Sequence, residues 1–438
     1  MSKRPLKREQ FFGVAAVAVC LSAAGFFALS TPGQWHVGES TDTESVTHED
    51  KKPVVEDPQY PSTAHVDTPE PMYAIYMSQC VVGTPSFRDN LVTLIETTPL
   101  NAVVIDIKDY SGTIAFPTQD ERFADASLVS CGARDMASFI ERLHEKGIYV
   151  IGRITVFQDP FYSAQYPAQA VQSVSRPGEP WEDNKGLSFV DVSSKPFWDY
   201  IVQLSKESYA VGFDELNYDY VRYPSDGPMK DASYVNDNKA EALEEFFKYL
   251  HAEVSPLGVA MSADLFGYVT VLSDDLGIGQ QLERALPYFD YIAPMVYPSH
   301  YNSGFAGLSN PNNDPYKVVY TSMKKAAERT AATETSVRTL DGEPILKEEI
   351  IPAQYSESGE LIVATTTRNV PTGMYTKESY DVRKMRPWLQ DFDYGKDYRP
   401  EDIAAQIQAT YDAGLTSWFF WDPANKYENV EAYLRGLE

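Results

Sequence analysis

Cysteine and histidine are scarce in this chain, whose 438 residues include 3 Cys and 6 His. Two cysteines are too few for a disulfide scaffold, and no Cys/His spacing is typical of a zinc site. Beyond the N-terminal apolar segment only Cys80 and Cys131 remain. These two thiols either form one structural disulfide, which we favour, or stay free.

Positive charge is also in short supply, with 37 Lys and Arg against 63 Asp and Glu and a net charge of −26. Such a surplus of negative charge argues against nucleic acid, or an anionic membrane surface, as a partner. The chain contains no phosphate loop, dinucleotide fingerprint or HExxH helix, and no internal repeat. We therefore expect no metal and no organic cofactor.

The N-terminus carries the longest uncharged run, residues 11–29, preceded by four Lys and Arg side chains. This run is long enough to span a bilayer, and its positive flank is expected to stay cytoplasmic. Residues 1–30 are therefore either an uncleaved signal anchor, which we favour, or a cleaved signal peptide. In both cases the rest of the chain lies outside the cytoplasmic membrane. Residues 31–70, rich in Thr, Ser, Asp, Glu and Pro, are expected to form a disordered linker.

From residue 71 to 438, strand-like runs alternate with amphipathic helical segments, a pattern typical of a parallel sheet wrapped in helices. Eight such runs predict an α/β fold, a (β/α)8 TIM barrel. The predicted strands are 74–77, 101–109, 148–157, 212–224, 259–264, 291–297, 383–391 and 417–421. We expect residues 158–194 to form a loop over the barrel mouth, and residues 331–381 to form an insertion with a β-hairpin flap.

The stretch 212–224 combines a buried-strand pattern with charges. Side chains alternate along a strand, so Leu216 and Tyr218 share the apolar face while Glu215, Asn217 and Asp219 share the other. Polarity rises toward the C-terminal end, where barrel enzymes keep their chemistry. Asp219 is thus expected at the barrel mouth.

Polar and aromatic residues also follow the other predicted strands, and a barrel would bring them together. We expect the following residues to bind substrate: Asp106, Lys108, Arg153, Asp159, Glu215, Asn217, Arg222, Tyr297, His300, Trp388, Gln390, Trp421 and Asp422. Each also has a structural interpretation. Asp106 and Lys108 would form an interior ion pair, His300 would be an exposed loop residue, and the tryptophans would belong to the core. Arg153 is favoured as the partner that keeps a catalytic acid ionised.

Cleavage of a glycosidic bond needs two carboxyl groups flanking that bond. Asp219 and Asp264 close neighbouring predicted strands, and paired strands lie roughly 4.8 Å apart. The two side chains therefore fit the spacing of about 5–9.5 Å that glycosidases use. We assign Asp219 as nucleophile or general base and Asp264 as general acid.

Several motifs resemble a family of bacterial envelope proteins described as glycoside hydrolases and long known as a domain of unknown function. They are residues 101–109, 152–160, 212–227, 262–268, 293–301 and 386–392, of which the run Asp-Tyr-Val-Arg-Tyr-Pro-Ser-Asp-Gly is the most specific. The resemblance covers about residues 71–330 and 382–430. It implies a TIM barrel of the alpha-amylase-like clans, in which the aspartate of the fourth strand, here Asp219, is the expected nucleophile or base.

The sequence thus predicts a membrane-tethered, extracytoplasmic glycoside hydrolase that acts on an envelope or extracellular polysaccharide. A catalytically silent barrel that binds glycan as an envelope scaffold is the alternative. Metal-dependent deacetylation is disfavoured, because the sequence shows no His/Asp ligand cluster at suitable spacing.

Overall fold

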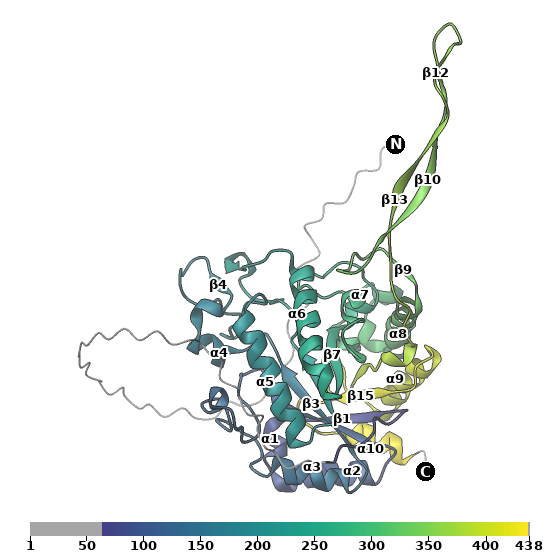
Figure 1. Cartoon of the computed structure of the whole chain (residues 1–438). Coiled ribbons are helices and arrows are strands. Elements are labelled where there is room, and N and C mark those ends of the chain that lie inside the picture. The colour runs from purple at the N-terminus through teal and green to yellow at the C-terminus, as the bar shows by residue number, and fades with distance from the viewer. Residues whose placement is uncertain (1–63, 437–438) are drawn as a thin grey trace, which may run out of the picture.

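A computed structural model describes residues 64–436, which form a closed barrel of eight parallel strands with helices around it (Figure 1). Each barrel strand pairs with the barrel strands that precede and follow it in the sequence, and the last barrel strand pairs with the first. The barrel strands are β1 (Tyr73–Met77), β2 (Ala102–Lys108), β3 (Tyr149–Thr155), β5 (Glu215–Asp219), β7 (Ala260–Phe266), β8 (Tyr291–Met295), β14 (Trp388–Gln390) and β15 (Trp418–Trp421). The predicted α/β barrel is confirmed.

All eight predicted strand positions contain a barrel strand, although two predictions were much too long. Residues 212–224 were expected to be extended, but β5 covers only Glu215–Asp219, because Gly212 caps α5 and Tyr220 adopts a positive φ of 51°. Residues 383–391 were expected to be extended throughout, but Val382–Lys384 form a 3-10 turn and β14 begins only at Trp388. Pro387 precedes β14, and a proline has no N–H for a strand ladder, which accounts for the short strand.

The helices cover the outside of the barrel, and most begin where the predicted amphipathic pattern starts. They are α1 (Gln79–Val82), α2 (Pro85–Glu96), α3 (Met136–His144), α4 (Pro160–Gln165), α5 (Lys195–Val211), α6 (Lys239–Val254), α7 (Leu282–Ala285), α8 (Pro315–Ala331), α9 (Pro400–Asp412) and α10 (Glu428–Arg435). The sequence had not predicted the shorter helices α1, α4, α7 and α10, and α4 lies within residues 158–194, which were expected to form a loop.

Two hydrophobic clusters reflect the alternation of side chains along the strands. The larger one fills the layer between barrel and helices and includes Leu216 and Tyr218 of β5. The hydroxyl of Tyr218 pairs with Ser205 of α5 at 2.9 Å. The smaller one lies inside the barrel and includes Tyr76 and Trp388. Because successive residues face opposite sides of a strand, Asp219 of β5 points inward, as predicted.

A long β-hairpin projects from the barrel (Figure 1). It consists of β10 (Pro344–Ile351) and β13 (Thr366–Thr376), which are antiparallel, with the short pair β11 (Gln354–Tyr355) and β12 (Leu361–Val363) toward its tip. The strand β9 (Glu334–Thr335) pairs with the base of β13. These strands lie within the predicted insertion 331–381.

The base of the hairpin lies at the amino ends of the barrel strands, because the insertion joins the end of α8 to the start of β14. After the hairpin, the Tyr380 N–H donates to the carbonyl of Thr330, near the end of α8, at 3.0 Å. The Arg386 N–H then donates to Ile292, near the start of β8, at 2.9 Å. The hairpin is therefore not a flap over the carboxyl ends, where barrel enzymes keep their active sites.

The chain ahead of β1 closes the amino end of the barrel. Asp214 accepts hydrogen bonds from the Val66 and Val150 N–H groups at 2.9 and 2.8 Å, and pairs with His65 and His144. Within residues 64–436 no helix is long and apolar enough to span a bilayer. The predicted span at 11–29 lies outside the described residues.

A disulfide joins Cys80 of α1 to Cys131, across 51 residues of sequence. Of the two alternatives that the sequence left open for these thiols, the structure therefore has the bridge.

Candidate active site

Arg153 of β3 lies at the centre of the polar residues inside the barrel. Its Nη1 donates to Asp106 Oδ1 at 2.6 Å, and its Nη2 and Nε donate to Asp219 Oδ2 at 2.5 and 3.1 Å. Its Nε also lies 3.8 Å from Asp264 Oδ2. Three carboxyl groups from β2, β5 and β7 thus surround one guanidinium group, although their residues are far apart in the sequence.

Asp264 is almost fully enclosed, with 1% of its surface exposed. Its Oδ1 accepts hydrogen bonds from Trp388 Nε1 at 2.8 Å and from Asn217 Nδ2 at 2.9 Å. Burial first, and then the nearby charge of Asp219, raise the pKa of Asp264 well above its ordinary value, against the opposing effect of Arg153. Asp264 therefore binds a proton more tightly than an ordinary carboxyl group, and the two donors on Oδ1 leave Oδ2 as the oxygen without a hydrogen-bond donor.

Asp219 and Asp264 share one polar environment, because both approach the same nitrogen of Arg153. Their Oδ2 atoms lie 3.1 and 3.8 Å from Arg153 Nε, so these two oxygens are at most about 6.9 Å apart, the sum of the two distances. This limit is compatible with the spacing of about 5–9.5 Å between carboxyl groups of glycosidases.

Asp106 forms a second buried contact that the sequence did not predict. Tyr76 of β1 donates its hydroxyl proton to Asp106 Oδ2 at 2.5 Å. Burial raises the pKa of Asp106 to about 6, while Arg153 acts in the opposite direction. The only signal for Tyr76 in the sequence is its position, since it has the same inward parity as Ala74 on the first strand.

Aromatic rings stand beside this polar cluster. Tyr76 and Trp421 stack with ring centroids 3.9 Å apart, and Trp388 meets Trp421 edge-on at 5.6 Å. The guanidinium carbon of Arg153 lies 5.0 Å from the centre of a Trp421 ring. Among the described residues, the buried Nε1 of Trp421 has no hydrogen-bond partner. This N–H is thus a donor without an acceptor beside the cluster, and sugar hydroxyls are suitable acceptors.

Tyr297, after β8, extends the site along the rim. Burial raises its pKa well above the ordinary value, and the charges of Asp264 and Asp219 add to the effect. Its ring contacts that of His300 at 5.5 Å. Gln390 is fully buried behind them, and its Oε1 accepts a hydrogen bond from the Ser299 hydroxyl at 2.9 Å. Tyr297 therefore faces the carboxyl groups, while Gln390 supports the loop that carries His300.

Lys108 and Asp159 form an ion pair at 2.9 Å, and both side chains are fully buried. The sequence had suggested Asp106 as the interior partner of Lys108, but Asp106 pairs with Arg153 instead. Asp159 also accepts a hydrogen bond from the Tyr162 N–H at the start of α4. This pair therefore fixes the loop after β3 to the barrel and does not face the shared space of the other carboxyl groups.

Three further residues predicted to bind substrate have structural partners. Glu215 lies at the amino end of β5, fully buried, and pairs with Arg386 at 2.9 Å. The carboxylate of Asp422 accepts N–H groups from the following turn, at 2.7 and 3.0 Å. The Nη1 of Arg222 donates to a backbone carbonyl at 3.0 Å, and its guanidinium packs against aromatic rings. These contacts show that Glu215 stabilises the barrel interior, and that Asp422 and Arg222 stabilise the loops that follow their strands.

Within residues 64–436, no group of three or more His, Cys, Asp or Glu side chains could hold a metal ion. In the carboxylate cluster, the guanidinium of Arg153 occupies the position that a cation would take.

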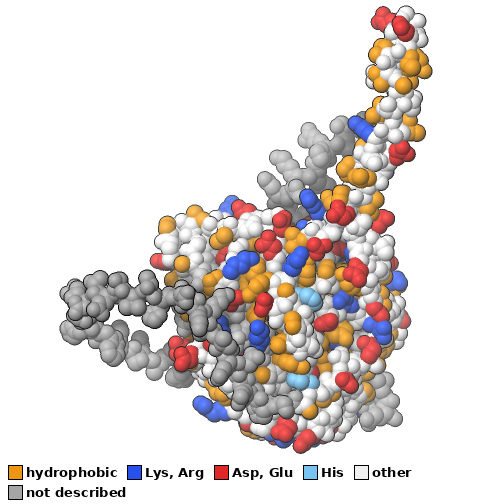
Figure 2. Space-filling model, viewed as in Figure 1, with side chains coloured by type: hydrophobic (Ala, Val, Ile, Leu, Met, Phe, Trp, Pro, Cys, Tyr) orange, Lys and Arg blue, Asp and Glu red, His pale blue; other side chains and the backbone are white. Residues whose placement is uncertain are grey.

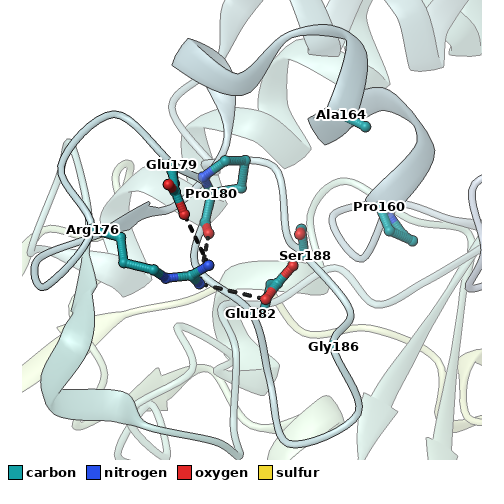
Figure 3. A pocket seen from close by; sticks show the side chains of 8 residues that line it. All are labelled: Pro160, Ala164, Arg176, Glu179, Pro180, Glu182, Gly186 and Ser188. Atoms are coloured by element: carbon teal, nitrogen blue, oxygen red, sulfur yellow. Dashed lines mark hydrogen bonds and ion pairs between the residues drawn. The ribbon is translucent and has the colours of Figure 1, made fainter. Parts of the chain in front are cut away.

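A surface cavity of about 310 Å³ lies in the long segment after β3 (Figure 3). Its lining consists of Pro160, Ala164, Arg176, Glu179, Pro180, Glu182, Gly186 and Ser188. Arg176 bridges Glu179 and Glu182 at 3.0 and 3.4 Å. The lining includes none of the clustered carboxyl groups, so this cavity is separate from the candidate active site.

Two solved structures are similar to this chain, and the first of them supports the barrel fold. The glycoside hydrolase domain of PgaB (BpsB) from Bordetella bronchiseptica is 14% identical and aligns over 83% of this chain and 98% of that chain, with a TM-score of 0.50. A hypothetical protein from Ruminiclostridium thermocellum is 30% identical over 47% of this chain and 98% of that chain, with a TM-score of 0.39. A search of curated proteins finds no match.

A family profile described as "Putative glycosyl hydrolase domain" matches residues 74–340 and 353–427. The match includes all eight barrel strands and each of the residues around Arg153. It leaves out residues 341–352, which hold β10 of the hairpin. Because the matched residues make up well over half of the sequence, the chain belongs to this glycosyl hydrolase family.

Proposed function

We propose that the protein hydrolyses glycosidic bonds of an extracellular or cell-envelope polysaccharide, with Asp264 as general acid and Asp219 as nucleophile or general base. One observation carries the proposal. Two carboxyl groups share the space around Arg153, and their surroundings separate their roles. Pairs of carboxyl groups whose environments divide them in this way are typical of glycosidases.

The roles follow from the contacts of each group. Asp264 keeps its proton through burial, and its Oδ1 is held by Trp388 and Asn217. Its Oδ2 is therefore the atom that delivers a proton to the leaving glycosidic oxygen. Asp219 is the ion-pair partner of Arg153 and, as a carboxylate, either attacks the anomeric carbon or takes a proton from water.

The cluster also suits the charge of the transition state. Asp106 and Asp219 each pair with the positive Arg153 and, in this proposal, Asp264 holds a proton, so the cluster carries one net negative charge. An oxocarbenium-like transition state is positively charged and is stabilised by such surroundings. Trp421 and Tyr297 supply the ring and the donor groups that hold the sugar.

The place of action is part of the same proposal. Residues 11–29 would anchor the chain in the cytoplasmic membrane, with the barrel on the outer side. The Cys80–Cys131 bridge supports this placement, because disulfides persist mainly in oxidising compartments. Protease digestion of intact cells, and of cells in which the outer face of the cytoplasmic membrane has been exposed, tests this placement. Cleavage of the barrel once that face is exposed would support it, and protection of the barrel in both preparations would contradict it.

The experiment for the activity is a screen of the full chain against polysaccharides from its own organism, measured as released reducing ends. We expect release by the wild type and none by Asp264→Asn. Retention on a polysaccharide column without release across the panel would instead support a glycan-binding scaffold and would overturn the hydrolase assignment.

A further inference from the structure

The hairpin strand β10 is exposed on both faces. None of its eight residues is buried, and Leu346 and Ile350 expose 51% and 67% of their surface. Figure 2 shows the hairpin projecting away from the barrel with apolar and charged side chains along it. A two-stranded ribbon is only marginally stable in water, and a sheet gains stability from further strands.

Both long edges of this ribbon are open over most of their length, because β9 pairs with β13 only at Tyr375 and Thr376, but the two edges differ in sequence. In the sheet order β10-β13-β9, β10 has a single neighbour, so its outer edge is unpaired among the described strands. Residues 345–351 form a proline-free run between Pro344 and Pro352. The strand β13 contains Pro371, which cannot donate a ladder hydrogen bond. Further pairing is therefore favoured on β10.

The free run reads Ile-Leu-Lys-Glu-Glu-Ile-Ile and is complementary to itself in the antiparallel direction. When Glu348 is placed on a twofold axis, Lys347 of each copy lies opposite Glu349 of the other. Leu346 then lies opposite Ile350, and Ile345 lies opposite Ile351. Opposite charges and aliphatic side chains that face each other across strands each stabilise a sheet by about 0.2–1 kcal/mol.

We propose that β10 pairs with β10 of a second copy of this chain. The product is a continuous four-stranded antiparallel sheet, in which each hairpin contributes β13 and β10. The pairing lies at the amino ends of the barrel strands, so both active-site mouths stay open. The family match omits residues 341–352, so this edge is a feature of the chain outside the matched family segments.

One pair opposes the association. Glu348 lies opposite its own copy on the axis, and each chain carries a net charge of −26. Like charges directly opposite each other destabilise a sheet. The pairing is therefore reversible, and Glu348→Gln is expected to tighten the dimer about 2- to 5-fold, which corresponds to the upper part of the range for one cross-strand pair.

Charge exchange tests the register. Sedimentation velocity of the full chain in mild detergent is expected to show a monomer–dimer equilibrium. Lys347→Glu places like charges at two symmetric pairs and is expected to weaken the dimer at least about tenfold. Within each hairpin Glu349 also pairs with Arg368 of β13 at 2.8 Å. The triple variant Lys347→Glu, Glu349→Lys and Arg368→Glu therefore restores both opposite-charge pairs across the axis, keeps an opposite charge at position 368, and is expected to restore the dimer. A wild type that stays monomeric, or a triple variant no tighter than Lys347→Glu, would overturn the proposal.

Cross-linking tests the axis. In a chain with Cys20→Ser, Glu348→Cys places two thiols opposite each other with Cα atoms about 4.5–5.5 Å apart, within the range of a disulfide. We expect a disulfide-linked dimer under mild oxidation. The matched control is Thr367→Cys, which lies opposite Ile350 on β13. In the four-stranded sheet two copies of it are separated by three strand spacings and by four residues along the strand, about 20 Å in all. Equal linkage of both variants, or linkage of Glu348→Cys to a different protein only, would refute the proposal.

Discussion

The substitution Asp219→Asn separates the two roles assigned to the carboxyl groups. Asn has nearly the same shape as Asp but carries no charge, so it cannot act as nucleophile or base. We expect turnover to fall about 10²- to 10⁴-fold or more, the usual contribution of a positioned acid–base group. The barrel stays folded, because the amide oxygen still accepts hydrogen bonds from Arg153, which also keeps its ion pair with Asp106.

The same substitution changes the proton affinity of Asp264. The Oδ2 atoms of the two groups are at most about 6.9 Å apart. At an effective dielectric constant of about 20, two unit charges at this distance interact by about 2.4 kcal/mol. Removing the charge of Asp219 therefore lowers the proton affinity of Asp264 by more than about tenfold. The pKa of Asp264 thus falls in the variant.

The assay is a pH titration of the Asp264 carboxyl group, by infrared difference spectroscopy or by carbon NMR, in wild type and Asp219→Asn. Asp290→Asn is the matched control, because Asp290 accepts a hydrogen bond from Met261 at the amino end of the barrel, away from Arg153. The reasoning is refuted if Asp264 titrates at the same pH in wild type and Asp219→Asn, or if the variant keeps normal turnover.

Four further predictions concern groups around the site and the barrel ends. Trp388→Phe removes a hydrogen bond that stabilises ionised Asp264, so the pKa of Asp264 rises. Kinetic measurements are expected to show an about 2- to 10-fold lower turnover and a pH–rate profile whose alkaline limb lies at higher pH. Asp106 binds its proton more tightly in the folded state, since burial raises its pKa to about 6. Its ionisation therefore lowers the free energy of unfolding by up to about 3 kcal/mol as pH rises from about 4 to 6. Denaturant titrations across this range should show a smaller loss of that free energy for Asp106→Asn than for the wild type. Asp214→Ala leaves two N–H groups and two histidines without their acceptor, and should lower the free energy of unfolding by about 3–5 kcal/mol in denaturant titrations, whereas Asp214→Asn should lose less. Replacing Cys80 and Cys131 by serine frees a 51-residue loop and should cost about 4 kcal/mol by chain entropy; equal denaturation midpoints with and without the bridge would contradict this.

Strand positions were predictable because their signals are local. The alternation at Leu216 and Tyr218 against Asn217 and Asp219 placed β5 and its inward face correctly, since parity along a strand needs no tertiary information. The lengths of β5 and β14 are the exceptions within this group, because both strands are shorter than predicted. At β14, Pro387 decided where the ladder begins, and the apolar pattern alone overextended the strand.

The partners of charged residues were much less predictable. Arg386 lies 171 positions from Glu215, and nothing local to either residue announces their ion pair. The same holds for Tyr76, whose contact with Asp106 appears only when β1 and β2 lie side by side in the barrel. The polar residues predicted to form the site therefore included neighbours of Arg153 as well as residues whose side chains hold loops in place.

The sequence by itself determined the barrel, the identity of the carboxyl groups on β5 and β7, and the place of the insertion, because hydrophobic periodicity and strand parity act over a few residues. Only the tertiary structure decided that three carboxyl groups share Arg153 and that the hairpin projects from the amino ends of the strands. Closure of the sheet sets these distances, and it joins residues that the chain keeps far apart.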